Sequence, residues 1–358
     1  KNRWDWGGLS GNNALPWSDN LIERHKDSWD WEVLSSNTSI PWSLELLAKY
    51  EERWDWGFIE WLRGLSYNEA LPWSFEIITR FNDRWEWEAL AENVGIPWSP
   101  QLIGRYEAEW NWDLLSSNAR LPWSVGLIER YRDRWDWSKL SSNVGLPWSL
   151  ELINHYDRAL DWGALSSNEA LPWTIEFINR YSDRWDWQIM AFNKSIPWSL
   201  DFIKEYEDRW DWSRLSFSEV LTWYPELIRR YEDRWDWQRL SGNVALPWSK
   251  ELIENYEDKW EWSSGVKSRG LSNNVAIPWS IELLERFEDH WDWIDLSLND
   301  ALPWSIDLIE RFETHWRGQI ISDNIVQQAS VIHPLDVTDI MKHTLGRTSR
   351  PSRSPRSW

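Results

Sequence analysis

Six histidines and a large number of carboxylates are the side chains of this chain that could transfer protons or bind a metal ion. No histidine has a carboxylate and a nucleophile, or further ligands, at a spacing typical of a catalytic or metal site. The histidines are His25, His155, His290, His315, His333 and His343. The chain has no cysteine, which excludes disulfides and thiolate ligands. We therefore expect no enzymatic activity, no metal and no cofactor, and the lack of cysteine favours a cytoplasmic location.

Tryptophan has the most binding potential here, because its large ring can anchor a protein interface or serve as a platform for a planar ligand. The chain has 38 tryptophans, and three of them return every 25 residues along most of its length. Two intervals are 31 residues long, and Leu160 once replaces the first tryptophan. The repeat reads W-D-W-x-x-L-S-x-N-x-x-L-P-W-S-x-E-L-I-E-R-Y-E-D-R. We number its places 1 to 25, leaving out the residues inserted in the two longer repeats. Such a period is typical of stacked architectures.

The second half of the repeat predicts a helix that begins after the serine at place 15. A serine side chain at this boundary accepts a hydrogen bond from a free backbone N–H of the first turn. Pro100 follows one of these serines, at the first helical position, where proline is favoured. Apolar residues at places 18, 19 and 22 and at the next place 1, such as Leu46, Leu47, Tyr50 and Trp54, form one stripe. We expect this to be the longer helix of the repeat.

The first half of the repeat predicts a shorter helix between the aspartate at place 2, for example Asp55 or Asp136, and the asparagine at place 9. We expect the asparagine to adopt the left-handed conformation and to bond its own backbone. The apolar pattern predicts that all three tryptophans are buried, Trp123 and Trp148 at place 14 included. Their indole N–H groups then need acceptors, and the turn carbonyls are the nearest ones.

These patterns predict an all-α, elongated α-solenoid of about twelve 25-residue two-helix repeats, with no sheet. Residues 1–316 form the Trp-rich repeat array. Residues 317–341 keep I-S-D-N at 321–324 and a weak form of P-W-S at 334–336, and we expect a degenerate capping repeat there. Residues 342–358 are rich in Ser, Arg and Pro and are expected to form a basic, disordered tail.

The charge of the chain is strongly acidic, with a formal net value of −20. After Asp339 there are five cations and no acids, so residues 1–339 carry −25. Such an array should repel nucleic acid and anionic membranes and attract basic proteins. No apolar run is long enough to span a membrane. We therefore expect a protein partner, for which a basic surface would fit, and no nucleic acid or membrane. The alternative is that these charges only keep a Trp-rich array soluble.

Two features vary among the repeats and are the candidates for partner binding. Six inserted residues lengthen the repeats that begin at Trp54 and Trp260, and the longer segments carry Trp61, Arg63 and Arg269. Insertions at one place of a solenoid map to one face, although surface loops also lengthen at little cost. Place 8 is the most variable internal position, and variation without function is the alternative explanation. Its bulky candidates are Tyr67, Phe192, Phe217 and Leu298.

The string W-D-W-x-x-L-S-x-N, followed by Leu or Ile and a helix, resembles the Trp-rich tandem repeats of predicted proteins from giant DNA viruses and some bacteria. The resemblance covers residues 4–324. The P-W-S helix start departs from the N-P-N-I-T type of start in the viral form. The resemblance implies a repeat scaffold and carries over no catalytic residue.

A noncatalytic α-solenoid that binds a protein partner is the leading functional hypothesis, because solenoids present extended surfaces. A self-assembling structural or filament protein is a second possibility, since the chain starts at Trp4, halfway through a repeat, and this leaves an apolar end for end-to-end self-association. A carbohydrate-binding protein with tryptophan platforms is a third, and it requires one exposed ring in each repeat.

Overall fold

The computed structural model describes residues 4–59, 62–263 and 270–316, and short helices repeat about every 25 residues along them. The fold is therefore an all-α repeat array, as the sequence predicts. The chain divides into two compact units, Lys1–Trp185 and Asp186–Trp358.

The expected capping repeat, 317–341, and the expected basic tail, 342–358, lie outside the residues that the structure describes. Trp61 and Arg269, two of the candidate binding residues, also lie outside them.

Each regular repeat contains two helices. We name them the W-helix, which begins at the tryptophan of place 3, and the S-helix, which follows the serine of place 15. The W-helices of the first unit are α1 (Trp6–Ser10), α3 (Trp31–Ser35), α6 (Trp87–Glu92), α8 (Trp112–Ser117), α10 (Trp137–Ser142) and α12 (Trp162–Ser167). Its S-helices are α2 (Asp19–Arg24), α4 (Leu44–Lys49), α5 (Phe75–Arg80), α7 (Pro100–Arg105), α9 (Val125–Arg130), α11 (Leu150–His155) and α13 (Ile175–Arg180).

The second unit continues the same alternation of the two helix types. Its W-helices are α14 (Trp187–Met190), α16 (Trp212–Phe217), α18 (Trp237–Ser241) and α21 (Trp293–Ser297). Its S-helices are α15 (Leu200–Glu205), α17 (Pro225–Arg230), α19 (Lys250–Asn255), α20 (Ile281–Arg286) and α22 (Ile306–Arg311).

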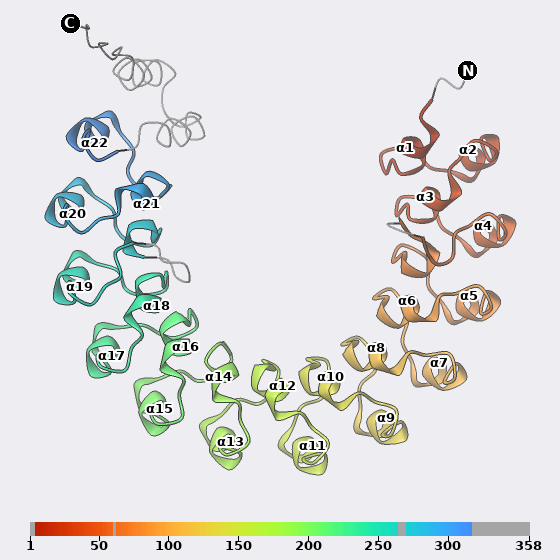
Figure 1. Ribbon diagram of the computed structural model, residues 1–358. Coiled ribbons are helices and arrows are strands. Elements are labelled where there is room, and N and C mark those ends of the chain that lie inside the picture. Colours follow the sequence, from red (N-terminus) through yellow and green to blue (C-terminus); the bar gives the residue numbers. More distant parts are fainter. Residues whose placement is uncertain (1–3, 60–61, 264–269, 317–358) are drawn as a thin grey trace, which may run out of the picture. The chain divides into compact units, whose positions relative to one another are not determined.

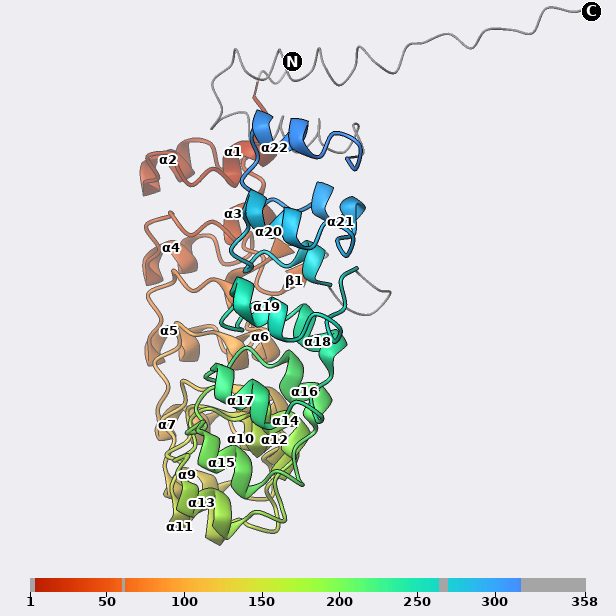
Figure 2. The same cartoon turned by 90° about the vertical axis from the view of Figure 1, so that its left-hand side faces the viewer.

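The two helix types form separate rows within each unit (Figure 1). In the first unit the S-helices α2, α4, α5 and α7 lie one above another, which is clear in both views (Figure 2). Successive W-helices pack on each other, as α8, α10 and α12 do. The S-helix has six residues in every described repeat and ends at place 21, where a turn follows, whereas the W-helices have four to six residues. The S-helix is therefore the longer in some repeats and of equal length in the others.

Local capping explains where the helices begin. The Oγ atom of Ser43 accepts a hydrogen bond from the backbone N–H of Leu46 at 3.1 Å, and most S-helices begin in this way. The Oδ1 atom of Asp136 accepts from the N–H of Lys139 at 3.0 Å at the start of a W-helix. Pro100 occupies the first turn of α7. These predicted helix starts are confirmed.

The repeat that begins at Trp54 departs from the prediction of a W-helix capped by Asp55. Its longer segment forms a two-residue antiparallel ladder, β1 (Phe58–Ile59) with β2 (Leu62–Arg63), and then the 3₁₀ turn η1 (Leu65–Tyr67). The expectation of no strand is wrong at this place, since the six extra residues are enough for a hairpin. The other long repeat has the 3₁₀ turn η2 (Leu271–Asn273).

The core consists of the aliphatic stripes of both helices and the tryptophans of place 1, whose exposed fraction is 4–7% from Trp29 to Trp291. The prediction that all three tryptophans are buried is only partly right. Most indoles at places 3 and 14 are half-buried, Trp123 and Trp148 among them, because these rings lie at the margins of the rows.

Candidate functional site

The serine of place 7 and the asparagine of place 9 connect successive repeats. Nδ2 of Asn143 donates to the carbonyl of Ser116 in the preceding repeat at 2.8 Å, and its Oδ1 accepts from the N–H of Gly145 at 2.8 Å. Oγ of Ser116 accepts from the N–H of Asp136 at 2.9 Å and donates to the carbonyl of Trp112 at 2.6 Å. Both side chains are buried, so these polar contacts hold the stack together.

The conformation of the place-9 asparagine differs from the prediction. Asn143 has φ −75° and ψ 115°, which is extended backbone rather than the left-handed region. Its bond to its own backbone is confirmed, but its amide faces the preceding repeat. The repeat that begins at Trp210 has Ser218 at place 9. Its hydroxyl replaces the asparagine amide as the donor and donates to the carbonyl of Ala191 in the preceding repeat at 2.6 Å.

The indoles at places 3 and 14 of a repeat cluster with the indole at place 1 of the next repeat. Trp135 packs edge-on against Trp112 at a centroid distance of 4.9 Å and tilted against Trp123 at 5.0 Å. The N–H of Trp135 donates to the carbonyl of Ile128 at 3.1 Å, that of Trp112 to the carbonyl of Glu107 at 3.2 Å, and that of Trp123 to the carbonyl of Asn118 at 2.9 Å. The expectation that main-chain carbonyls accept these bonds is confirmed. The indoles therefore stabilise the packing of successive repeats.

In many repeats the ring of the place-3 tryptophan is covered by a cation from place 25 of the same repeat. The guanidinium of Arg134, at place 25, lies 5.4 Å from the ring centroid of Trp112 and pairs with Glu107 of the preceding repeat at 3.0 Å. The cations that lie over place-3 rings are Arg53, Arg134, Arg184, Arg209, Arg234 and Lys259, and the rings of His290 and His315 take the same position. These ring faces are covered from within the chain, which reduces the surface left for a planar ligand.

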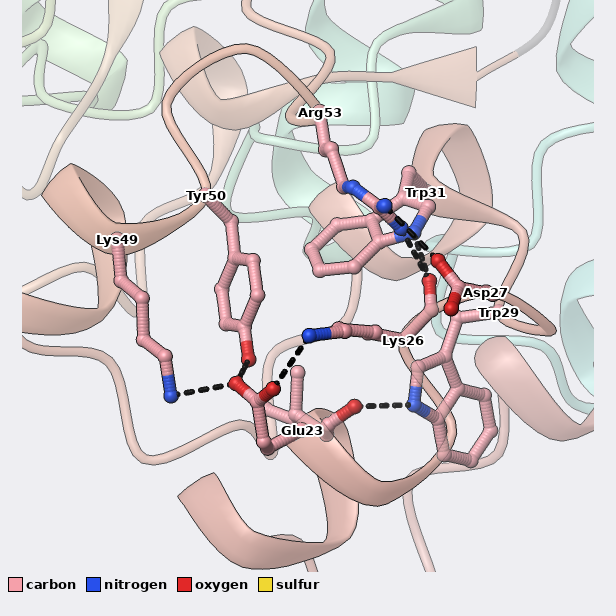
Figure 3. Close-up of polar contacts among 9 residues, drawn as sticks. Glu23, Lys26, Asp27, Trp29, Trp31, Lys49, Tyr50 and Arg53 are labelled. Carbon is pink, nitrogen blue, oxygen red and sulfur yellow. Dashed lines mark hydrogen bonds and ion pairs between the residues drawn. The ribbon is translucent and has the colours of Figure 1, made fainter.

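A second polar contact links successive S-helices. The Tyr50 hydroxyl donates to the Glu23 carboxylate, which also pairs with Lys26 at 2.7 Å and Lys49 at 2.6 Å (Figure 3). The hydrogen bond from Lys26, followed by those from Lys49 and Tyr50, lowers the pKa of Glu23 to about 2. Further along, Tyr156 donates to Glu129 at 2.7 Å. Many charged side chains of the S-helices are therefore already paired with other side chains of the same chain.

Open grooves run between neighbouring S-helices. Volumes of about 300 Å³ beside His155 and about 480 Å³ beside Asn179 lie in the first unit, and one of about 320 Å³ beside Tyr256 lies in the second. Over the described ranges no group of three or more His, Asp or Glu side chains could hold a metal ion. No helix there is long and apolar enough to cross a membrane.

The place-8 candidates lie at the end of the W-helix, beside the turn. Phe217 is 50% exposed, Leu298 is 56% exposed and Phe192 is 41% exposed. The bond from Ser218 to Ala191 joins the residues next to Phe217 and Phe192, so these two phenylalanines belong to adjacent turns. In the first unit Tyr67 is half-buried, and the exposed Arg63 lies over its ring at 5.4 Å. The structure therefore brings Arg63 and Tyr67 into contact and places Phe192 and Phe217 on adjacent turns, whereas Leu298 belongs to a turn that is adjacent to neither phenylalanine.

Valines at place 10 extend this surface, and the sequence analysis missed them. Val94, Val144 and Val275 are 40%, 58% and 53% exposed. Their alternation with the buried asparagine of place 9 was the available signal, since residues on either side of an inward side chain in extended backbone point away from it. We name places 8 and 10 the turn edge.

The comparisons with known proteins do not assign the chain to a family. No family model, curated protein or solved structure matches it. The repetition of Trp-rich helical units therefore stands on the sequence and on the structure alone.

Proposed function

We propose that the chain is a noncatalytic repeat scaffold that binds a protein partner along the turn edge. The observation that carries the proposal is the pair Phe192 and Phe217, two exposed aromatic rings on adjacent turns of a hydrogen-bonded stack. Aromatic side chains held on a rigid frame are typical anchors of protein interfaces. The S-helix side offers less, because many of its charged groups already pair with one another.

The resemblance to the Trp-rich repeats of giant DNA viruses and bacteria agrees with a scaffold role. It supports no catalytic residue, and we propose that the chain is not an enzyme. The strongly acidic charge favours a partner with a basic surface.

Replacing both phenylalanines tests the proposal. A partner is first identified by cross-linking to the intact chain and then purified, and its Kd is measured against the wild type and the double variant Phe192→Ser, Phe217→Ser. We expect binding to weaken at least tenfold with unchanged helicity. Ile306→Ser is the matched control, because Ile306 is a 39% exposed residue of an S-helix. Equal binding by the double variant and the wild type would show that the turn edge is not the interface.

The two other functions have their own measurements. Self-assembly predicts a sedimentation coefficient that rises with protein concentration. A tryptophan platform predicts that sugars quench indole fluorescence. The cations over the place-3 rings make carbohydrate binding by tryptophan platforms less favourable, because they already occupy those ring faces.

A further inference from the structure

The cation of place 25 has the same surroundings in repeat after repeat. Arg184 lies 4.7 Å from the ring centroid of Trp162, pairs with Asp157 of the preceding repeat at 3.1 Å, and donates to the carbonyl of Asp157 at 3.1 Å. The groups that hold the cation are thus a ring face, a carboxylate at place 23 or 24, and a main-chain carbonyl. Arg234 in the second unit uses the same three kinds of group.

The repeat at residues 85–109 has these surroundings but no cation. Its place 25 is Glu109, and the acid of the preceding repeat is Asp83. Both carboxylates are exposed, and neither pairs with a Lys, Arg or His within the described ranges. Asp83 accepts one bond, from the Asn82 amide at 2.6 Å. Two acids therefore occupy the places at which Arg134, Arg184 and Arg234 form salt bridges with the preceding repeat.

The ring of this repeat is in place to receive a cation. Trp87 packs against Tyr106 at 4.7 Å and edge-on against Trp110 at 4.8 Å, as the place-3 rings of other repeats do. Its outer face has no cation from the described chain. Its indole N–H also forms no bond with the described residues, whereas that of Trp112 donates to a main-chain carbonyl.

We propose that Trp87, Asp83 and Glu109 form a binding site for an arginine side chain from a basic segment of a partner protein. The incoming guanidinium stacks on the Trp87 face and pairs with the two carboxylates, as the guanidinium of Arg184 stacks on Trp162 and pairs with Asp157. A guanidinium fits better than an ammonium, because its planar fork can stack and bond carboxylates at once. A metal ion fits worse, because an indole face supplies no ligand and two carboxylates are too few.

The repeat at residues 135–159 provides an internal comparison. Its place 25 is Ala159, so the face of Trp137 also lacks the cation of place 25. The preceding repeat, 110–134, has Arg132 at place 23 beside Asp133 at place 24, and the charge of Arg132 opposes a second cation. The charge pattern thus favours the Trp87 site. The proposal does not rest on the turn edge, which lies at the opposite end of the W-helices.

The test uses the full chain and a fluorescein-labelled peptide of glycine and serine with two arginines and one benzoylphenylalanine. Fluorescence anisotropy measures its Kd at physiological ionic strength, and photo-cross-linking locates it. Glu109→Arg fills the site with the chain's own cation, as in the sister repeats, so this variant should fold. We expect it to weaken binding at least fivefold, and cross-links in the wild type to fall within residues 83–112.

Two controls distinguish binding at the Trp87 site from nonspecific attraction of the peptide to the acidic chain. Glu310→Arg makes the same charge change at an exposed position in the last turn of the S-helix α22, away from the turn edge, and it should weaken binding less than twofold. Replacing the peptide arginines with neutral citrulline should weaken binding as much as Glu109→Arg does. Equal effects of the two protein variants, no effect of Glu109→Arg, or cross-links outside the named residues would overturn the proposal.

Discussion

Removal of the Asn143 side chain should break the connection between two repeats. Asn143→Ala deletes the bond to the Ser116 carbonyl at 2.8 Å and the bond from the Gly145 N–H at 2.8 Å. Ser116 is fully buried, so its carbonyl loses a partner that water cannot replace, at about 1–3 kcal/mol. Gly145 is only half-buried, and its amide adds about 1 kcal/mol. We expect a loss of about 2–4 kcal/mol.

A repeat array unfolds in parts, so the measurement has to be local. Hydrogen exchange followed by mass spectrometry reports the opening of residues 110–160. A loss of about 2–4 kcal/mol corresponds to exchange roughly 30- to 900-fold faster. Asn143→Ser should cost less, about 1 kcal/mol, because Ser218 shows that a hydroxyl can keep the donor.

Ser142→Ala is the matched control, because its exposed hydroxyl bonds only within its own helix. Its exchange should change less than threefold. If Asn143→Ala exchanged no faster than Ser142→Ala, the buried amide would not hold the repeats together.

Three further predictions follow from the same contacts. The lowered pKa of Glu23 stabilises the fold above the unfolded pKa of 4.5, and this stabilisation is lost as pH falls towards about 2. The melting temperature of Glu23→Gln should therefore approach that of the wild type over this range, and a constant difference would contradict the reasoning. Leu160→Trp restores the place-1 ring against which Trp148 would pack, as Trp123 packs against Trp135. It should raise the free energy of unfolding in urea by about 1 kcal/mol, and a lower value, from overpacking, would contradict the prediction. Trp135→Ala should cost about 3–5 kcal/mol and Trp148→Ala less, since only Trp135 is fully buried, and equal urea midpoints for the two would refute that order.

Part of the candidate site was accessible to sequence reasoning. The variation at place 8 led to Phe192, Phe217 and Leu298, which are exposed in the structure. It did not lead to Val144 or to the cation site at Glu109. Recognising Glu109 requires the knowledge that a cation lies over the Trp of place 3 in the sister repeats, and that contact joins residues 22 positions apart along the chain.

The sequence by itself determined the period, the two helices of each repeat and the residues at which they begin. Those features depend on contacts within four residues, such as that of Ser43 with Leu46, so a single repeat contains all the information. Only the tertiary structure decided which neighbour each buried polar group meets. Asn143 and Ser116 are 27 residues apart, and a local pattern cannot state which atom of the preceding repeat faces the amide. For the same reason the exposure of each indole followed from the stacking of the rows, and not from its place in the apolar stripe.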